Sequence, residues 1–267
     1  MEHEITQNSI IPISLLLTSL AYSYFLAPYI PKGPLRVLSY TPIFYIFFLI
    51  PWYSSSSFLR GILSFFITWI TSFKLLLFCF NRGFLFSCKT YIDFVLVAIF
   101  PIKMKEINGR YELLQLFDKP YLAKSLQEFW GRRWNRLASY VLRQTIYVPT
   151  QNSLKGVVGN GAAKMGALVI TLVVSGVMHE LMFYYITCGK RPTWECAHFF
   201  VLQGVCMVLE AGFRYFWRWK PFHPLLPNFF TLGFVVTTFY WLLVVPVWRS
   251  GQSKCNFKPK GFFLKDL

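Results

Sequence analysis

The chain has 267 residues, of which 55% are hydrophobic and only 14% are charged, whereas roughly a quarter of the residues in soluble domains are charged. This composition excludes an ordinary soluble domain and indicates an integral membrane protein. In so hydrophobic a chain, the formal charge of +16 is typical of basic residues that face anionic lipid headgroups, and it does not favour nucleic acid as a partner.

Six apolar stretches approach the ~20 residues that cross the hydrocarbon layer of a bilayer. They run from Ile10 to Ile30, Val37 to Tyr53, Phe58 to Phe80, Met165 to Ile186, Ala197 to Trp217 and Asn228 to Trp248. We therefore expect an all-α polytopic membrane helix bundle, with about six transmembrane helices and one amphipathic interfacial helix. No repeat or linker divides the sequence, which predicts a single membrane-embedded domain over 1–267. Its parts are the N-terminal spans (1–101), a basic segment (102–164) and the C-terminal spans (165–267).

The Lys and Arg residues predict how the chain is oriented in the membrane. With Lys74 set aside, 18 of them fall on the side that holds 31–37, 81–164 and 214–226, against 8 on the other side. By the positive-inside rule, the long central segment faces the cytosol and both termini lie on the opposite side.

The cysteine and histidine spacings do not favour a metal or a redox cofactor. The six cysteines contain no C-x-x-C, and the four histidines lack ligand spacing. A disulfide framework is not indicated either, although Cys188 and Cys196 could pair if their loop faces an oxidising compartment.

The basic segment carries 11 Lys or Arg between Ile102 and Lys164. The spacing from Ser125 to Glu128 is that of a capping box, which predicts a helix start. In a continuous helix, Asn135 lies on the flank that Glu128 occupies two turns earlier. The apolar face and the arginine face of that helix are formed by Leu126, Trp130, Trp134, Leu137 and Val141, and by Arg132, Arg136 and Arg143. This pattern is typical of a membrane-surface helix, and headgroup attraction alone accounts for its arginines.

His179 lies deep inside an apolar run. At ~1.5 Å per residue it is about 21 Å from Met165 along a helix, in a hydrocarbon layer ~30 Å thick. An ionisable group at that depth costs several kcal/mol, so it indicates a functional site. A desolvated imidazole stays neutral and can take a proton from a hydroxyl, which makes His179 a candidate general base. The alternative is a histidine that ties helices together by hydrogen bonds.

The neighbours of His179 qualify this hypothesis. One turn earlier, Ser175 and Gly176 leave space beside the imidazole for a ligand or for another helix. Glu180 points about 100° away on a helix, so we expect it to find a different partner. Further along, Glu210 and Arg214 have the i, i+4 spacing of an intrahelical ion pair.

Several motifs resemble the plant wax synthase family, the long-chain-alcohol O-fatty-acyltransferases of the membrane-bound O-acyltransferase superfamily. They are F-D-K-P-Y-L from Phe117 to Leu122, S-L-Q-E-F-W-G-R-R-W-N from Ser125 to Asn135, S-G-V-M-H-E-L from Ser175 to Leu181, F-Y-Y from Phe183 to Tyr185, R-P-T-W-E from Arg191 to Glu195, and G-V-C from Gly204 to Cys206. The resemblance runs from about Phe117 to Trp248, with a looser match before Ile102.

The resemblance implies transfer of a fatty acyl group from acyl-CoA to a long-chain alcohol, which forms a wax ester and free CoA in the endoplasmic reticulum membrane. It implies no cofactor beyond acyl-CoA as co-substrate. It identifies His179 as the catalytic histidine and Asn135 as the second superfamily position, which orients reactants or assists at the thioester. In this reaction His179 removes the alcohol proton, and Asn135 can donate a hydrogen bond to the developing oxyanion.

The same resemblance suggests where acyl-CoA binds. Arginine can hold the phosphates of CoA with paired hydrogen bonds. The substrate-binding candidates are Arg132, Arg133 and Arg136 with Trp130 and Trp134, and the candidates for support of the base are Ser175 and Glu180.

One departure from the family pattern leaves alternatives open. Family members carry two further hydrophobic segments between a P-I-K-like stretch, here Pro101 to Lys103, and the F-D-x-P-Y-L stretch, whereas this chain has 104–116 alone. Their loss preserves the orientation but removes part of the wall of a reaction chamber. The alternatives are a sterol O-acyltransferase of the same family and a shortened, non-catalytic membrane protein that binds lipid or partners.

Overall fold

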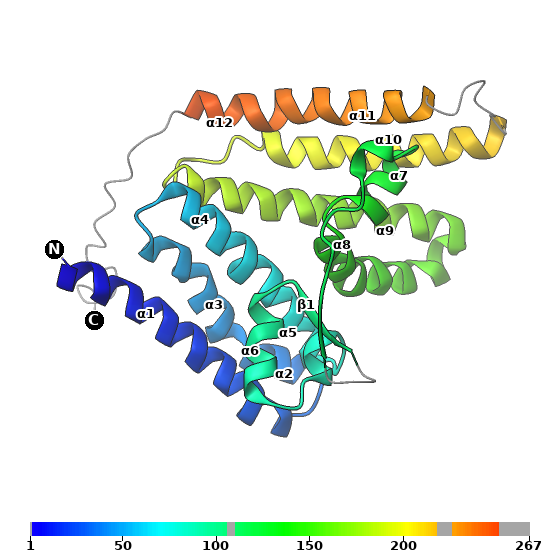
Figure 1. Cartoon of the computed structure of the whole chain (residues 1–267). Helices are drawn as coiled ribbons and strands as arrows, with labels where there is room; N and C mark the ends of the chain where they lie inside the picture. The colour runs from blue at the N-terminus through cyan, green and yellow to red at the C-terminus, as the bar shows by residue number, and fades with distance from the viewer. Residues whose placement is uncertain (1, 106–109, 218–225, 251–267) are drawn as a thin grey trace.

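The computed structural model describes residues 2–105, 110–217 and 226–250. These ranges form a bundle of helices, and in Figure 1 the N-terminal helices lie at the lower left while the C-terminal helices run across the top. The helices long and apolar enough to cross a membrane are Ile10–Tyr29, Ser57–Cys79, Arg136–Ile186, Glu195–Arg214 and Leu226–Arg249, and a shorter apolar one is Thr41–Tyr53. The expected all-α membrane bundle is therefore confirmed.

The N-terminal half contains six α-helices and a short β-ribbon. The α-helices are α1 (Glu2–Ala21), α2 (Pro34–Ser39), α3 (Thr41–Leu49), α4 (Ser57–Leu63), α5 (Ser72–Cys79) and α6 (Tyr91–Ile99). The 3₁₀ and π segments are Tyr22–Leu26, Ala27–Tyr29, Ile50–Tyr53, Ser64–Thr71 and Phe84–Ser87. Strand β1 (Ile102–Lys105) pairs antiparallel with β2 (Arg110–Leu113), a ribbon that the hydrophobic pattern does not predict.

The C-terminal half contains the long helices. They are α7 (Leu126–Glu128), α8 (Arg136–Leu142), α9 (Val148–Ile186), α10 (Glu195–Trp217), α11 (Leu226–Phe239) and α12 (Val245–Ser250). The 3₁₀ and π segments are Pro120–Leu122, Phe129–Arg133, Arg143–Tyr147 and Tyr240–Val244. In Figure 1, α9, α10 and α11 run side by side as a layer above the N-terminal helices.

The predicted second span is divided in two. Helix α2 ends at Ser39, Tyr40 follows as its C-cap, and α3 begins at Thr41 with Pro42 in its first turn. Proline lacks the backbone N–H that a continuous helix needs, so Pro42 favours a new helix start there. The remaining apolar helix, Thr41–Tyr53, is shorter than the helices that can cross the membrane.

Two buried cations organise the N-terminal half. Lys74 is 2% exposed, and its Nζ donates to the backbone carbonyls of Val97, Ala98 and Phe100 at 2.6, 3.2 and 2.9 Å. Arg36 uses all five of its N–H groups, on the carbonyls of Pro28, Ile30 and Phe78 and on the side chain of Asn81. Because the last carbonyls of a helix lack intrahelical partners, Lys74 stabilises the end of α6.

The run from Arg136 to Ile186 folds back on itself. Gly159 has φ 78° and ψ 165° inside α9, a conformation open to glycine but costly for other residues. The two arms then pack closely, because a Cβ placed on Gly166 would lie 3.2 Å from the Leu154 side chain. The span expected to begin at Met165 is thus the second arm of a helical hairpin, and Figure 1 shows its turn at the right-hand end of the bundle.

The structure also corrects the expected continuous helix from Leu126 onward. The helical segment ends at Arg133, Trp134 is extended, and α8 starts only at Arg136. The break is held by Asp118 N–H, which donates to the Arg133 carbonyl at 2.9 Å, and by Arg136 N–H, which donates to Leu116 at 2.9 Å. The predicted continuity of this amphipathic helix is therefore wrong, and the flank it shared between Glu128 and Asn135 does not exist.

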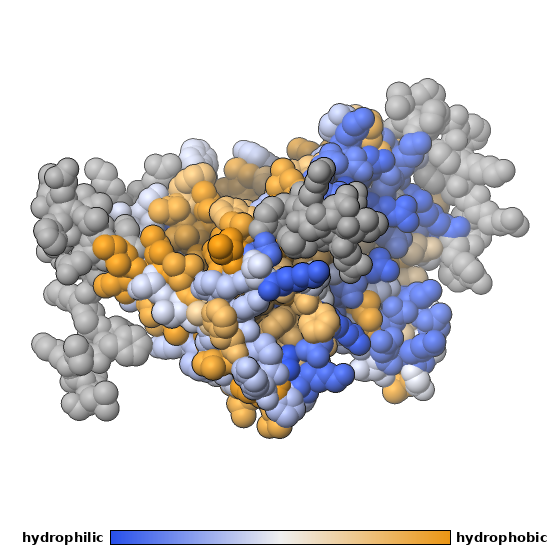
Figure 2. Space-filling model, turned by 60° about the horizontal axis from the view of Figure 1, so that its bottom comes forward, coloured by the Kyte–Doolittle hydropathy of each residue, from blue (hydrophilic) through white to orange (hydrophobic). Residues whose placement is uncertain are grey.

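Polar surface gathers at one end of the molecule. Figure 2 shows hydrophilic side chains concentrated toward the right-hand end, where Figure 1 places the turn of the α8–α9 hairpin, and apolar side chains over much of the rest.

Cys196 is a free, buried thiol, whereas Cys188 is disulfide-bonded. The conditional pairing of Cys188 with Cys196 is therefore wrong.

Candidate active site

A cavity of about 310 Å³ lies between the break at Trp134 and the middle of α9. Residues from the membrane-spanning helix Ser57–Cys79, from the α7–α8 region, from α9 and from α10 surround it. The polar lining residues are Trp69, Gln127, Trp130, Trp134, Asn135, Ser139, Arg143, Tyr147, Thr171, Ser175 and His179. Both residues predicted to be catalytic thus line the same cavity although they are 44 positions apart in the sequence.

His179 is held by one hydrogen bond and two aromatic rings. Its Nδ1 lies 2.7 Å from the backbone carbonyl oxygen of Ser175. A carbonyl can only accept, so Nδ1 carries the hydrogen and the neutral ring keeps its lone pair on Nε2. The imidazole packs edge-to-face on Trp69 and against Phe200, with ring centroids 4.8 and 4.3 Å apart. Nε2 has no hydrogen-bond partner among the described residues, so it is the ring nitrogen left for a substrate.

Asn135 owes its position to the break that sequence reasoning missed. It has φ 40° and ψ 65°, a left-handed conformation that asparagine adopts more readily than most residues. Its Oδ1 accepts the N–H of Ala138 at 3.2 Å and caps α8. Because the cap uses only the oxygen, the two Nδ2 hydrogens have no partner within the part of the chain that the structure describes, and they are available at the cavity.

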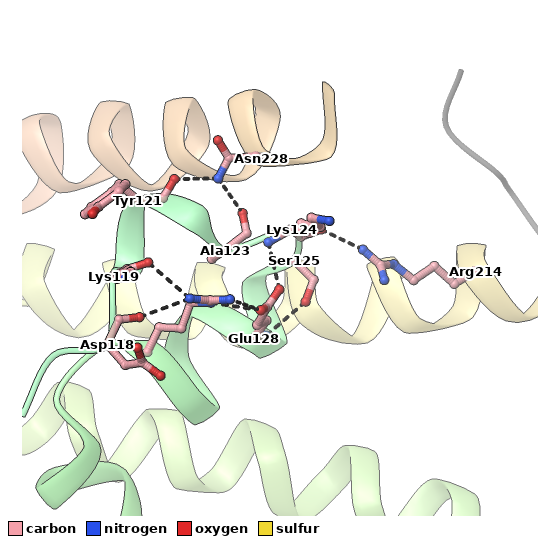
Figure 3. Close-up of polar contacts among 10 residues, drawn as sticks. Asp118, Lys119, Tyr121, Ala123, Lys124, Ser125, Glu128, Arg214 and Asn228 are labelled. Carbon is pink, nitrogen blue, oxygen red and sulfur yellow. Dashed lines mark hydrogen bonds and ion pairs between the residues drawn. The ribbon is translucent and has the colours of Figure 1, made fainter. Parts of the chain in front are cut away.

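A network of polar contacts fixes the segment before this break. Figure 3 shows Glu128 accepting the Lys124 N–H, and the Arg214 side chain reaching the Lys124 carbonyl. At the other end, Asn228 of α11 donates to the carbonyls of Tyr121 and Ala123. Segments far apart in the sequence thereby hold the approach to α7 in place.

The predicted helix start is confirmed, and Glu128 has a further role in it. Ser125 Oγ accepts the Glu128 N–H at 2.9 Å. Glu128 binds Arg133 through an ion pair of 2.7 Å. The Lys124 N–H, aided by the Arg133 guanidinium, holds the pKa of the Glu128 carboxyl below its ordinary value, although partial burial acts in the opposite direction. The ion pair of Glu210 with Arg214, at 2.8 Å, is also confirmed.

The structure separates the three predicted phosphate ligands. Arg133 is engaged inside the protein, where it donates to Glu128 and to the carbonyls of Asp118 and Lys119. Arg132 and Arg136 are exposed but do not line the cavity. Arg143, which the sequence placed only on the charged helix face, is exposed and does line it.

The two tryptophans of this region line the cavity in different ways. Trp130 donates through Nε1 to Gln203 Oε1 at 3.1 Å, and the Gln203 amide donates to Thr238 at 2.9 Å. Gln203 is fully buried, so this chain of bonds fixes the Trp130 ring against α10 and α11. Trp134 is partly exposed and stacks on Phe129 at 5.5 Å. Gln203 had no signal in the sequence, because it is a lone amide in an apolar run.

Of the residues next to His179, one lines the cavity and two contact α10. Ser175 lines the cavity, and its backbone fixes the imidazole. A Cβ on Gly176 would lie 3.0 Å from the backbone of Ala197, so its lack of a side chain makes room for α10. Glu180 accepts the N–H groups of Trp194 and Ala197, at 2.8 and 3.3 Å, and so caps the start of α10. The partner expected for Glu180, different from that of His179, is therefore the backbone at the start of α10.

No site for a metal emerges in the ranges 2–105, 110–217 and 226–250, where no three His, Cys, Asp or Glu residues are grouped so that they could hold one ion. The cavity combines the neutral base of His179, the amide donor of Asn135 and an arginine at 143 with further polar and apolar side chains. Such a set can transfer a proton and stabilise an oxyanion.

Comparisons with known proteins connect this cavity to a family. A family model described as "Membrane bound O-acyl transferase family" matches residues 113–202, which include both Asn135 and His179. Curated relatives from Arabidopsis thaliana include probable long-chain-alcohol O-fatty-acyltransferase 9, 32% identical over 99% of this chain and 97% of that protein. Acyl-CoA–sterol O-acyltransferase 1 is also 32% identical, over 92% of this chain and 90% of that protein.

The alignments also show that a relative has more residues than this chain. The first of these extends over 335 positions, 68 more than the 267 residues of this chain, so that relative has residues with no counterpart here. A second such enzyme, probable long-chain-alcohol O-fatty-acyltransferase 2, is 31% identical over 93% of this chain and 90% of its own length. The chain therefore belongs to the membrane-bound O-acyltransferase family, in the group that contains the plant long-chain-alcohol O-fatty-acyltransferases.

Proposed function

We propose that this protein transfers a fatty acyl group from acyl-CoA to the hydroxyl of a long-chain alcohol, which yields a wax ester and free CoA. The observation that carries the proposal is that the lone pair of His179 and the unused amide hydrogens of Asn135 belong to residues lining one cavity. Relatives named as long-chain-alcohol O-fatty-acyltransferases support this acceptor. The membrane of the endoplasmic reticulum is the proposed location, with the bilayer supplying both lipid substrates.

In this proposal, His179 is the general base. The alcohol oxygen attacks the thioester carbonyl carbon as its proton passes to Nε2, and a new C–O bond forms. The tetrahedral intermediate then collapses, the C–S bond breaks, and the departing sulfur takes the proton back from the imidazolium. The Ser175 carbonyl accepts from Nδ1–H in the neutral ring and in the cation alike. It therefore keeps the ring in the same position during both proton transfers.

Asn135 supplies hydrogen bonds to the intermediate. Its oxygen is committed to Ala138, so the amide can present only N–H groups to the cavity. Donors fixed in advance stabilise negative charge on a carbonyl oxygen without reorganising during the reaction. The left-handed backbone at this residue and its cap bond keep the amide in one orientation.

Acyl-CoA is proposed to enter at the polar end of the cavity. Arg143 lines the cavity there, and Arg132 and Arg136 are exposed. We propose these three as contacts for the CoA phosphates. Arg133 instead stabilises the fold through its bonds to Glu128 and to the Asp118 carbonyl. Trp130 and Trp134 are proposed to contact the substrate with their ring faces. No cofactor or metal takes part in this scheme.

The experiment that tests the function uses yeast cells that lack their own neutral-lipid acyltransferases. Wild type and His179→Ala are expressed, fatty alcohols and sterols are fed separately, and esters are quantified by mass spectrometry. We expect wax esters from wild type only. Sterol esters in place of wax esters would establish the sterol acceptor, which the sterol-acyltransferase relative supports. With verified membrane insertion, no ester from any acceptor would establish a non-catalytic membrane protein.

The CoA contact has its own test. Arg143→Ala should raise the KM for acyl-CoA about 10-fold, the equivalent of one charge-assisted hydrogen bond, and leave kcat unchanged. Arg133→Ala should instead lower thermal stability, because Glu128 loses its partner. An unchanged KM in Arg143→Ala would remove this arginine from the substrate site.

A further inference from the structure

Trp69 brings the N-terminal half of the chain into the cavity. It belongs to the π-helical segment Ser64–Thr71, inside the membrane-spanning helix Ser57–Cys79. Such π segments are rare and occur frequently at functional sites. Neither the family motifs nor the charge pattern gave this tryptophan any role, because it lies in an apolar run far from them.

The indole contacts the His179 ring and lines the same cavity as Asn135. Its ring meets the His179 imidazole edge-to-face, with centroids 4.8 Å apart and planes at 74°. It also belongs to a buried cluster with Leu137 and Ala138 in the first turn of α8. That turn is the one that Asn135 caps, since Asn135 Oδ1 accepts the Ala138 N–H.

The indole N–H of Trp69 is a buried donor without a partner among the described residues. The side chain is only 2% exposed, so bulk water does not satisfy the nitrogen in its place. A buried donor left unpaired costs about 1–3 kcal/mol. A phenylalanine would fill much of the same space at no such cost, so packing alone does not account for this N–H group.

A second tryptophan of the cavity, the partly buried Trp130, behaves differently. Trp130 also lines the cavity, and its indole N–H is paired with Gln203 inside the protein. The fold therefore satisfies the indole donor of Trp130 and leaves that of Trp69, next to the base, unsatisfied among the described residues.

We propose that Trp69 Nε1–H donates a hydrogen bond to the thioester carbonyl oxygen of acyl-CoA, as a second donor beside the Asn135 amide. This rests on the proposed acyl transfer. The indole gains and loses no proton during the reaction, because its N–H only stabilises the negative charge that the carbonyl oxygen acquires as the alcohol attacks. Two fixed donors then face that oxygen, and His179 handles the proton.

The test is Trp69→Phe, which keeps an aromatic ring and removes the N–H. We expect kcat to fall about 10²-fold, the typical effect of losing one oxyanion donor, with little change in the KM for acyl-CoA. Thermal stability should not fall, because the variant no longer buries an unpaired donor. Trp130→Phe should lower the melting temperature, because it leaves the buried Gln203 oxygen without its donor.

The control for the same exchange is Trp241→Phe. Trp241 is exposed on the segment Tyr240–Val244 and does not line this cavity. This control should keep wild-type kcat. Wild-type kcat in Trp69→Phe would overturn the proposal, and so would a fall in kcat that is matched by loss of stability. If wild type itself forms no ester, the acyl-transfer function fails first and the role of Trp69 fails with it.

Discussion

Two buried cations of the N-terminal half and two residues of the cavity use their polar atoms in opposite ways. In the N-terminal half, Lys74 has three carbonyl partners and Arg36 has five bonds, so each cation uses all of its donors within the fold. In the cavity of the C-terminal half, His179 and Asn135 each use one polar atom to fix their position and keep another available. Incomplete bonding at a residue that lines the cavity, rather than burial alone, thus marks a candidate for chemistry.

The largest effect that tests this contrast comes from His179. His179→Ala should lower kcat by about 10²- to 10⁴-fold, the usual contribution of a positioned general base. His198→Ala is the matched control, because His198 is exposed on α10 and does not line the cavity. Initial rates with purified protein measure both, and equal rates in the two variants would reduce His179 to a structural residue.

Two variants of Asn135 distinguish its oxygen, which caps α8, from its amide hydrogens, which are proposed to bind the substrate. Asn135→Asp keeps an oxygen for the Ala138 N–H and should preserve the fold, but it removes the amide donors and should lower kcat about 10²- to 10³-fold. Asn135→Ala should lose the same activity and, in addition, about 1 kcal/mol of stability with the cap. Full activity in Asn135→Asp would show that the amide hydrogens do not contact the substrate.

Lys74 tests the other side of the contrast. Lys74→Met should reduce the stability of the folded protein by about 1–3 kcal/mol, because the last carbonyls of α6 lose their donor. Thermal unfolding in detergent measures this loss, and kcat per folded molecule should stay at the wild-type value. A loss of kcat at unchanged stability would place Lys74 in the reaction.

The smallest predicted effect concerns Glu128 and pH. Its folded pKa is lowered by the Lys124 N–H and Arg133, so its contribution to stability is complete above the unfolded pKa of about 4.3. That contribution disappears as the pH falls through the lower folded pKa. Wild type should therefore melt above Glu128→Gln at pH 6, and the difference should narrow below pH ~4. A difference that persists unchanged at acidic pH would contradict the assigned ion pair.

The sequence predicted the bundle and the residues of the candidate site better than their geometry. Hydrophobic runs and the depth of His179 follow from local composition, and the capping box at Ser125 follows from spacing. The break at Trp134 does not, because it depends on hydrogen bonds to Leu116 and Asp118 that no local pattern reveals. The helical periodicity of residues 126–143 was therefore a misleading guide, and the fold changed the roles of two arginines.

The sequence also does not predict which contacts individual side chains make. Arg133 and Arg143 look alike in the sequence, yet one binds Glu128 and the other lines the cavity. Trp69 is one tryptophan among nine, and its contact with His179 and its unpaired, buried N–H distinguish it. Such roles depend on which segments meet in space, which a single sequence does not specify.

The most direct test of acyl transfer by this shortened chain is the stoichiometry of its products. Purified protein in lipid is supplied with isotope-labelled acyl-CoA and a long-chain alcohol, and both the labelled ester and free CoA are measured over time. We predict one CoA released for each ester formed, with both products lost in His179→Ala. Release of CoA without ester, or no turnover in well-folded wild type, would contradict the account.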